Sequence, residues 1–98
     1  MEPEMFVHGR KLLFDFQRRH ADAKSVVDIW LDETEKAEWK GPADIKHEYA
    51  SASFLPGNRV IFNIKGNRYR LVVVVVYVHG MVKIDWIGTH AEYSKRKW

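Results

Sequence analysis

The strongest constraint on the fold is an uninterrupted apolar run at residues 71–78, which consists almost entirely of valine. Valine is branched at Cβ, so its side chain favours extended backbone over helix. The run has eight residues, far fewer than the roughly 20 that a helix needs to cross a membrane. It is therefore interpreted as the centre of a long β-strand, predicted over residues 68–78.

Turn signals on both sides of this strand predict two hairpins. Residues 65–67 precede it, and their glycine and asparagine tolerate the positive φ angles of a tight turn. A histidine and a glycine at residues 79–80 follow it. Further strands are therefore predicted at residues 59–64 and 81–88, and the three strands form an antiparallel meander.

Helical periodicity dominates the part of the chain before the meander. Residues 10–20 place Leu12, Leu13 and Phe16 on one face of a predicted helix. Asp22 is the predicted N-cap of a second helix, the clearest amphipathic one in the chain. The apolar face of that helix consists of Ala23, Val26, Val27, Trp30, Thr34 and Ala37.

Shorter elements complete this outline. A glycine and a proline at residues 41–42 end the second helix and favour a short helix or turn over residues 43–49. Residues 6–8 are a candidate edge strand, and the sequence Pro-Gly-Asn within residues 51–58 is a turn signal. Helices followed by antiparallel strands indicate an α+β fold.

The chain is interpreted as one domain over residues 1–98. Residues 1–4 are interpreted as an extension or a disordered end, with Met5 as a candidate natural start, and residues 94–98 as a basic tail. The first residues are acidic and do not resemble a secretion signal. Cysteine is absent, which suits a reducing compartment. A cytoplasmic protein with no membrane span is therefore expected.

The charge balance points to polyanionic partners. The net charge is +3 and the pI is about 9.3, so RNA or DNA is the first class of partner to consider. A surface charge that only improves solubility is the alternative interpretation.

Several kinds of active site are excluded by their motifs. The chain has no phosphate-binding P-loop, dinucleotide-binding glycine pattern, zinc-protease motif or nucleophile elbow. No metal and no cofactor are expected, because the histidines lack metal-ligand spacing and cysteine is absent. These histidines are His8, His20, His47, His79 and His90.

One cluster of residues suits metal-free RNA cleavage. His90 follows the last predicted strand and exchanges a proton near neutral pH. Tyr93 offers a ring for stacking on a base and a hydroxyl for phosphate. Arg68 and Arg70 share one face of the long strand near its turn and supply positive charge. Such a set can stabilise an attacked phosphate and transfer protons to and from the RNA.

Each of these residues also has a purely structural interpretation. A histidine after a strand is more often a turn or surface residue, and Arg70 can pair with a carboxylate or cover apolar surface with its stem. Tyr93 can be a core aromatic residue. Trp30 and Trp39 are interpreted as packing residues. The acidic face over residues 28–38 is interpreted as solvated and remote from any RNA.

Four segments resemble those of one family, the HigB toxins, and together they are specific. They are NRVIFNIKGNRYRLV at residues 58–72, IGTHAEY at 87–93, EWKGPAD at 38–44 and ASA at 50–52. The similarity extends over residues 5–93. It implies a RelE/ParE-like fold, with N-terminal helices packed on a small twisted antiparallel sheet.

The resemblance also implies an activity and its residues. HigB toxins cleave messenger RNA on the ribosome without metal or cofactor, and a neighbouring helix-turn-helix antitoxin silences them. Arg70 matches the arginine expected at the scissile phosphate, His90 stands where the second catalytic group is expected, as either acid or base, and Tyr93 matches the tyrosine that orients RNA. Lys65 and Arg68 are candidate binders of the RNA backbone.

The chain departs from many such toxins after the tyrosine, where they continue with a further segment. The basic tail with Lys95 and Arg96 is a candidate replacement for it. Two other functions stay open: a ParE-like toxin that poisons DNA gyrase, and an RNA-binding module without activity. The fold does not decide among the three. A titratable histidine beside Arg70 and Tyr93 favours cleavage.

Overall fold

The computed structural model describes residues 5–98 and shows helices packed against a five-stranded sheet. The strands are β1 (Phe6–His8), β2 (Ser53–Leu55), β3 (Arg59–Ile64), β4 (Tyr69–Val76) and β5 (Met81–Thr89). The helices are α1 (Arg10–Arg19), α2 (Lys24–Lys36), α3 (Pro42–Glu48) and α4 (His90–Ser94), with 3-10 turns η1 (Ala21–Ala23) and η2 (Tyr77–His79). The predicted α+β class is confirmed. The predictions for residues 1–4 lie outside the described residues.

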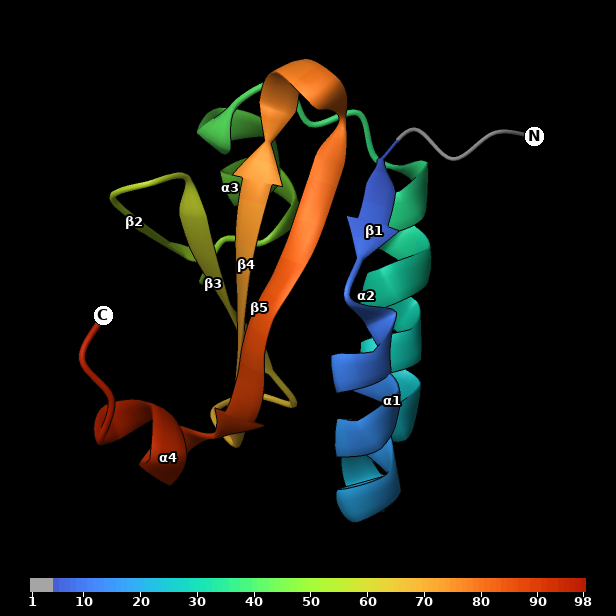
Figure 1. Ribbon diagram of the computed structural model, residues 1–98, viewed down its shortest axis with the longest axis vertical. Coiled ribbons are helices and arrows are strands. Elements are labelled where there is room, and N and C mark those ends of the chain that lie inside the picture. The colour runs from blue at the N-terminus through green and yellow to red at the C-terminus, as the bar shows by residue number, and fades with distance from the viewer. Residues whose placement is uncertain (1–4) are drawn as a thin grey trace.

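The valine-rich strand β4 lies at the centre of the sheet, as predicted. The strand order is β1-β5-β4-β3-β2 (Figure 1). β4 pairs antiparallel with β3 and with β5, so the predicted meander is confirmed. A bulge in the β4–β5 pairing lies between Val72 and Val73 and locally increases the twist. With strands on both sides, β4 has its backbone hydrogen bonds satisfied in the sheet.

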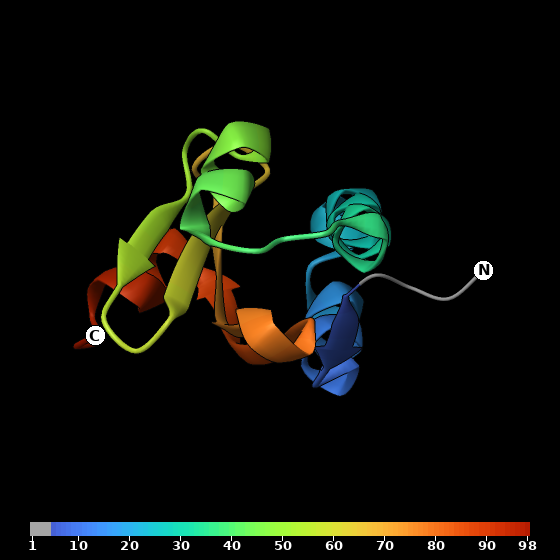
Figure 2. The ribbon, with the colours of Figure 1, turned by 90° about the horizontal axis from the view of Figure 1, so that it is seen from above.

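The helices gather around one side of the sheet. α1 and α2 run side by side in opposite directions, as Figure 1 and Figure 2 show. α3 contributes Ile45 to the same core as these helices. α4 lies apart from them, beside the ends of β4 and β5 (Figure 1).

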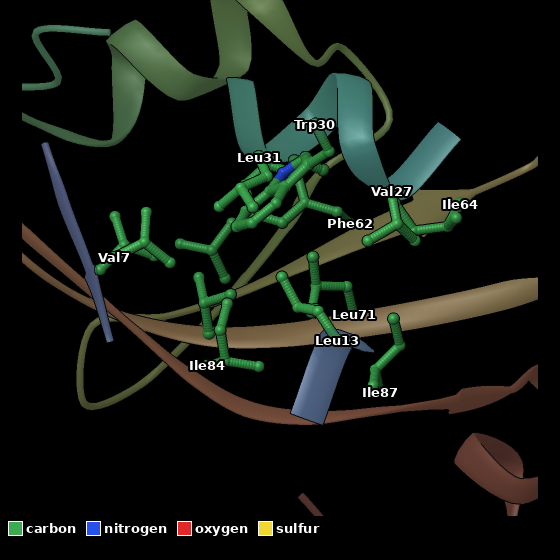
Figure 3. Packing of buried hydrophobic residues seen from close by; sticks show 14 of the residues in the cluster. Val7, Leu13, Val27, Trp30, Leu31, Phe62, Ile64, Leu71, Ile84 and Ile87 are labelled. Carbon is green, nitrogen blue, oxygen red and sulfur yellow. The ribbon is translucent and has the colours of Figure 1, made fainter. Parts of the chain in front are cut away.

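The core lies between α1, α2 and the facing side chains of the sheet. Trp30 of α2 meets Phe62 of β3 edge to face, with ring centroids 5.4 Å apart. Leu13 of α1 lies close to Leu71 of β4 in the same cluster (Figure 3). Trp39 stacks on Phe62 at 6.1 Å. Both tryptophans are almost fully buried, so their interpretation as packing residues is confirmed.

Alternate residues of β4 point to opposite faces of the sheet. Leu71, Val73 and Val75 belong to the helix-covered core. Val72, on the other face, is also fully buried, whereas Val74 is half-buried. Burial on this second face is therefore complete at Val72 and decreases toward the end of the strand.

Several boundaries differ from the predictions. β1 is an edge strand as expected, but it pairs parallel to β5, so the sheet is mixed. β2 forms within the segment that was interpreted as a turn, because its backbone pairs with β3. The long strand ends at Val76, and η2 follows. The helix α4 was not predicted at all.

Asp22 is not the N-cap of α2, contrary to the prediction. Ala23 occupies that position, and no side chain within residues 5–98 caps the helix. The Asp22 carboxylate instead accepts hydrogen bonds from the Tyr69 hydroxyl at 2.6 Å and from Arg68 Nη1 at 3.0 Å. The η1 turn runs directly into α2 and leaves this carboxylate free to anchor the β3–β4 hairpin.

Within residues 5–98, no helix is both long enough and apolar enough to span a membrane.

Candidate functional site

The candidate site lies where the β3–β4 turn, the end of β5 and α4 meet (Figure 1). The sheet register aligns Arg70 with Gly88 and Tyr69 with Thr89. The His90 amide donates to the Arg68 carbonyl at 2.8 Å. Antiparallel pairing of β4 and β5 thus brings the predicted arginines next to the start of the helix that carries the predicted histidine and tyrosine.

A capping box starts α4 at this place. The Glu92 amide donates to Thr89 Oγ1 at 3.1 Å, and the Thr89 amide donates to Glu92 Oε1 at 2.8 Å. The hydrogen bond from the Thr89 backbone is the main reason why the pKa of Glu92 lies below its ordinary value. The cap fixes where the helix begins, and His90 and Tyr93 then fall on one helical face at i and i+3.

Gly88 allows α4 to turn close against β5. A Cβ at this position would lie 2.5 Å from the ring of Trp86 and 2.9 Å from Glu92 Oε1. With a Cβ at residue 88, the Trp86 ring and the Glu92 side chain would have to shift. The glycine in the Gly-Thr-His sequence therefore lets the Trp86 ring and the capping carboxylate approach the same piece of backbone.

Arg70 is buried, with 8% of its surface exposed. Its Nη1 donates to the carbonyls of Asn67 at 3.3 Å and Tyr69 at 3.1 Å, and its Nη2 donates to Asn67 Oδ1 at 2.5 Å. Among residues 5–98, no carboxylate forms a salt bridge with it. The alternative that Arg70 pairs with a carboxylate is therefore wrong for the described chain, and the guanidinium keeps an uncompensated charge.

Tyr93 lies over this guanidinium. Arg70 Cζ is 5.8 Å from the centroid of the tyrosine ring, within the range of a cation–π contact. The tyrosine is half-buried and does not belong to the helix-covered core. The interpretation of Tyr93 as a core aromatic residue is therefore wrong, and the structure brings it together with Arg70.

The end of the chain folds back onto Tyr93. The Trp98 ring stacks on the Tyr93 ring at 5.1 Å, and Trp98 Nε1 donates to the Tyr93 carbonyl at 3.3 Å. Arg96 Cζ is 5.3 Å from the ring centroid of Trp86 and 5.0 Å from that of Trp98. Trp86 and Trp98 are site residues that sequence reasoning missed, since lone tryptophans carry no motif.

His90 is exposed on the first turn of α4. Its backbone is held at both ends, because its amide binds Arg68 and its carbonyl accepts from Ser94 Oγ at 2.9 Å. Within the described residues, the imidazole itself makes no hydrogen bond that orients it. The side chain is therefore accessible to a ligand.

The predicted backbone binders differ in how free their charges are. Arg68 forms an exposed ion pair with Asp22 at 3.0 Å, and Arg96 makes cation–π contacts with the rings of Trp86 and Trp98. Lys65 and Lys95 are exposed. Lys65 stands in the turn with a φ of 52°. The charges of Lys65 and Lys95 are therefore more accessible to a ligand than those of Arg68 and Arg96.

His20 is a further residue at this end that the sequence did not single out for the site. Its ring stacks on Phe16 at 4.4 Å and lies 5.2 Å from the ring of Tyr69. The Tyr69 hydroxyl in turn holds Asp22, and this hydrogen bond is the first cause of the lowered pKa of Asp22. Aromatic contacts thus join the end of α1 to Tyr69 of β4, and the Asp22 carboxylate joins η1 to the same tyrosine. Only its position at the end of a helix distinguished His20 in the sequence.

In the described part of the chain, no three histidine, aspartate or glutamate side chains are grouped so that they could hold a metal ion.

A comparison with known families gives one match. Residues 23–96 match the model of the HigB toxin family, described as the RelE-like toxic component of a toxin–antitoxin system. No curated protein matches the chain. The matched range contains α2, α3, the whole hairpin system and α4, so it covers the core of the sheet and the candidate site. Four helices and a five-stranded mixed sheet are compatible with the RelE-like fold that the resemblance implied. The chain belongs to the HigB family of RelE-like toxins, the toxic components of toxin–antitoxin systems.

Proposed function

We propose that this toxin is a ribosome-dependent endoribonuclease that cleaves messenger RNA in the cytoplasm and so inhibits translation. The observation that carries the proposal is the Arg70 guanidinium, which is buried, has no carboxylate partner among residues 5–98 and lies 5.8 Å from the centroid of the Tyr93 ring. A buried cation without a counterion attracts a phosphate strongly, because the surrounding dielectric is low. The exposed His90 nearby adds a group that can transfer protons, which a surface that only binds RNA does not need.

The chemistry needs a cation and two proton transfers. A base removes the proton from a ribose 2′-hydroxyl, whose oxygen attacks the adjacent phosphorus. The bond from phosphorus to the 5′ oxygen of the next nucleotide breaks, and an acid protonates that oxygen. The products are a 2′,3′-cyclic phosphate and a 5′-hydroxyl.

Each site residue has a place in this reaction. Arg70 stabilises the negative charge that develops on the phosphate oxygens. His90 performs one of the two proton transfers, as base or as acid, since it is exposed beside the arginines. Tyr93 orients the RNA by stacking on a base or by binding phosphate through its hydroxyl. No metal or cofactor takes part in these steps.

Positive side chains around the site bind the RNA backbone. Lys65 and Lys95 are the main candidates because both are exposed. Arg68 and Arg96 contribute less, since Asp22 and two tryptophan rings already engage them. Such contacts weaken as salt rises, because each one releases counterions from the RNA.

A toxin of this family has an antitoxin partner. We propose that this partner is a helix-turn-helix protein that binds the toxin and silences it. An adjacent short gene encoding such a protein would support this, and co-purification of the two proteins would test it.

The first test is cleavage of a labelled messenger RNA in a reconstituted translation reaction, with and without ribosomes. The wild type is expected to cut only when ribosomes are present, and Arg70→Ala and His90→Ala are expected to lose the cuts. His79→Ala is a matched control, because His79 is an exposed histidine in η2, outside the site. No cuts by the wild type under either condition would refute the proposal, and would leave gyrase poisoning or plain RNA binding as the function.

A further inference from the structure

We infer that Asn67 is a positioning residue for Arg70: it holds the guanidinium in one orientation and leaves its phosphate-binding edge free. The inference rests on the proposed function, since it assigns to the hairpin turn the task of presenting Arg70 to the RNA. Asn67 does not itself contact the reacting atoms in this scheme.

Among the described residues, the acceptors of the Arg70 guanidinium all lie in a short stretch of its own hairpin. Asn67 accepts twice, through its carbonyl at 3.3 Å and through its side-chain Oδ1 at 2.5 Å, and the Tyr69 carbonyl accepts at 3.1 Å. The Asn67 side chain is the only one of these acceptors that a substitution can remove. It binds Nη2, while both carbonyls bind Nη1.

The donors that remain are the ones a phosphate needs. A guanidinium carries five N–H donors. Two acceptors face Nη1 and one faces Nη2, which leaves the Nε hydrogen and the second Nη2 hydrogen without a partner in the described residues. Nε and one Nη nitrogen together form the fork that binds two oxygens of a phosphate. Asn67 therefore occupies part of the guanidinium while leaving this pair of donors available.

The turn is built to keep Asn67 in place. The Arg68 amide donates to the Lys65 carbonyl at 3.3 Å and closes the turn. Lys65 and Gly66 have φ values of 52° and 64°, so the chain reverses tightly before Asn67. The Asp22 carboxylate anchors the same hairpin through Arg68 and Tyr69.

A neutral amide suits this task better than a carboxylate. An amide oxygen accepts from Nη2 without cancelling the charge of the guanidinium. An aspartate at the same position would hold Arg70 as well, but it would also compensate the charge that attracts the phosphate. The Asn67 amide therefore holds the guanidinium in place without neutralising its charge.

The experiment compares Asn67→Ala, Asn67→Asp and the control Asn63→Ala. Asn63 is the cross-strand partner of Arg70, is exposed, and makes no side-chain hydrogen bond to it. Two quantities are measured: kcat and KM of ribosome-dependent cleavage, and the NMR signals of the Arg70 Nη protons. Resolved Nη signals report a guanidinium that does not rotate freely, whether or not the protein cleaves RNA.

Asn67→Ala is expected to merge the Arg70 Nη signals and to lower kcat about 10- to 100-fold with little change in KM, since a misoriented group costs mainly the chemical step. Asn67→Asp is expected to keep the signals resolved and still to lower cleavage about 10-fold or more, through the lost charge. Asn63→Ala is expected to resemble the wild type in both measurements.

A double-mutant cycle separates positioning from a structural role. In an Arg70→Lys background, Asn67→Ala is expected to have no further effect on kcat, because the group that it positions is already gone. Equal losses in both backgrounds would overturn the inference, as would Nη signals that stay resolved in Asn67→Ala. Full activity of Asn67→Asp would overturn the claim that the residue holding Arg70 must be uncharged.

The proposed function and this inference can fail separately. A wild type that cuts no RNA would refute the function, while the NMR comparison would still decide whether Asn67 holds Arg70. A wild type that cuts normally, together with an Asn67→Ala variant of equal kcat, would overturn the positioning role and leave the function intact.

Discussion

The two faces of the sheet use the same central strand for different purposes. Leu71 points into the helix-covered core and is fully buried among apolar side chains. Its neighbour Arg70 points to the other face, where it meets the amide of Asn67 and the ring of Tyr93. Because successive side chains of a strand point to opposite faces, one residue of β4 can stabilise the fold while the residue before it contributes to the candidate site.

The two faces also differ in how well their buried polar atoms are hydrogen-bonded. On the helix-covered face, the described residues leave Trp30 Nε1 and Thr34 Oγ1 buried without a hydrogen-bond partner. On the opposite face, both Nη nitrogens of the buried Arg70 have at least one acceptor, in Asn67 or Tyr69. The core therefore tolerates small defects because apolar burial dominates it, whereas the site depends on placed polar contacts.

The largest expected effect comes from Leu71→Ala. Truncating this fully buried side chain removes apolar contact and leaves a cavity, which costs about 2–5 kcal/mol of the free energy of unfolding. Chemical denaturation measures the loss. Variant molecules that remain folded should cleave RNA like the wild type, and a specific defect in the kcat of the folded fraction would break the separation between the faces.

Arg70→Ala, one residue earlier, is expected to do the reverse. Cleavage should fall about 10²–10³-fold, equivalent to about 2.7–4 kcal/mol of transition-state stabilisation. The fold should persist, because Arg70 does not belong to the core cluster. Expression without antitoxin gives a second readout, and a variant that still arrests growth would contradict the role of Arg70.

Gly88→Ala tests how tightly α4 is set against β5. A Cβ would lie 2.5 Å from the Trp86 ring, so the ring and the start of α4 must shift. We expect a decrease in cleavage of about 10-fold, together with a changed tryptophan fluorescence spectrum. Thr89→Ser is the mild control, since a serine hydroxyl also caps a helix. Unchanged cleavage and fluorescence in Gly88→Ala would show that the close approach has no role.

Thr34→Val addresses the polar defect on the core face. The Thr34 hydroxyl is buried without a hydrogen-bond partner among the described residues, so folding removes it from water with nothing in return. Replacing it with a methyl group is expected to raise the free energy of unfolding by about 1 kcal/mol, because this desolvation cost disappears. Thr34→Ser keeps the hydroxyl, loses a methyl group and should be destabilising. If both variants are destabilised equally, a bound water satisfies the hydroxyl.

The smallest expected effect is a pH dependence at the hairpin anchor. The hydrogen bond from Tyr69 comes first among the causes that hold the pKa of Asp22 below its ordinary value of 3.8. A carboxylate with a lowered pKa stabilises the folded state above its unfolded pKa, and this contribution is lost as the pH falls through the folded value. Stability should therefore decrease below about pH 3.8 and decrease less steeply in Asp22→Asn. Parallel pH curves for both proteins would exclude the anchor.

Much of the fold could be predicted from local patterns. The valine run at β4, the turn before it and the amphipathic face of α2 each carry their own signal over consecutive residues. β2 could not be predicted in this way, because three residues of strand exist only by pairing with β3. The parallel pairing of β1 with β5 likewise joins segments far apart in the sequence.

The candidate site was predicted in part. Arg70, His90 and Tyr93 were named from residue chemistry and from the family resemblance, and the structure places them around one end of β4. Asn67 was interpreted only as a turn residue, since nothing local shows that its side chain reaches Arg70. Trp98 was assigned to a basic tail, although it stacks on Tyr93.

By itself, the sequence determined the class of the fold, its central hairpin and the family to which the chain belongs. These depend on β-branched preference, helical periodicity and motif spacing, which act between near neighbours in the chain. Only the tertiary structure decided the surroundings of the Arg70 guanidinium. It places Asn67 and Tyr93 against this group, and it places no described carboxylate close enough to neutralise its charge. Those features depend on strand register and on the close approach at Gly88, where segments distant in the chain meet.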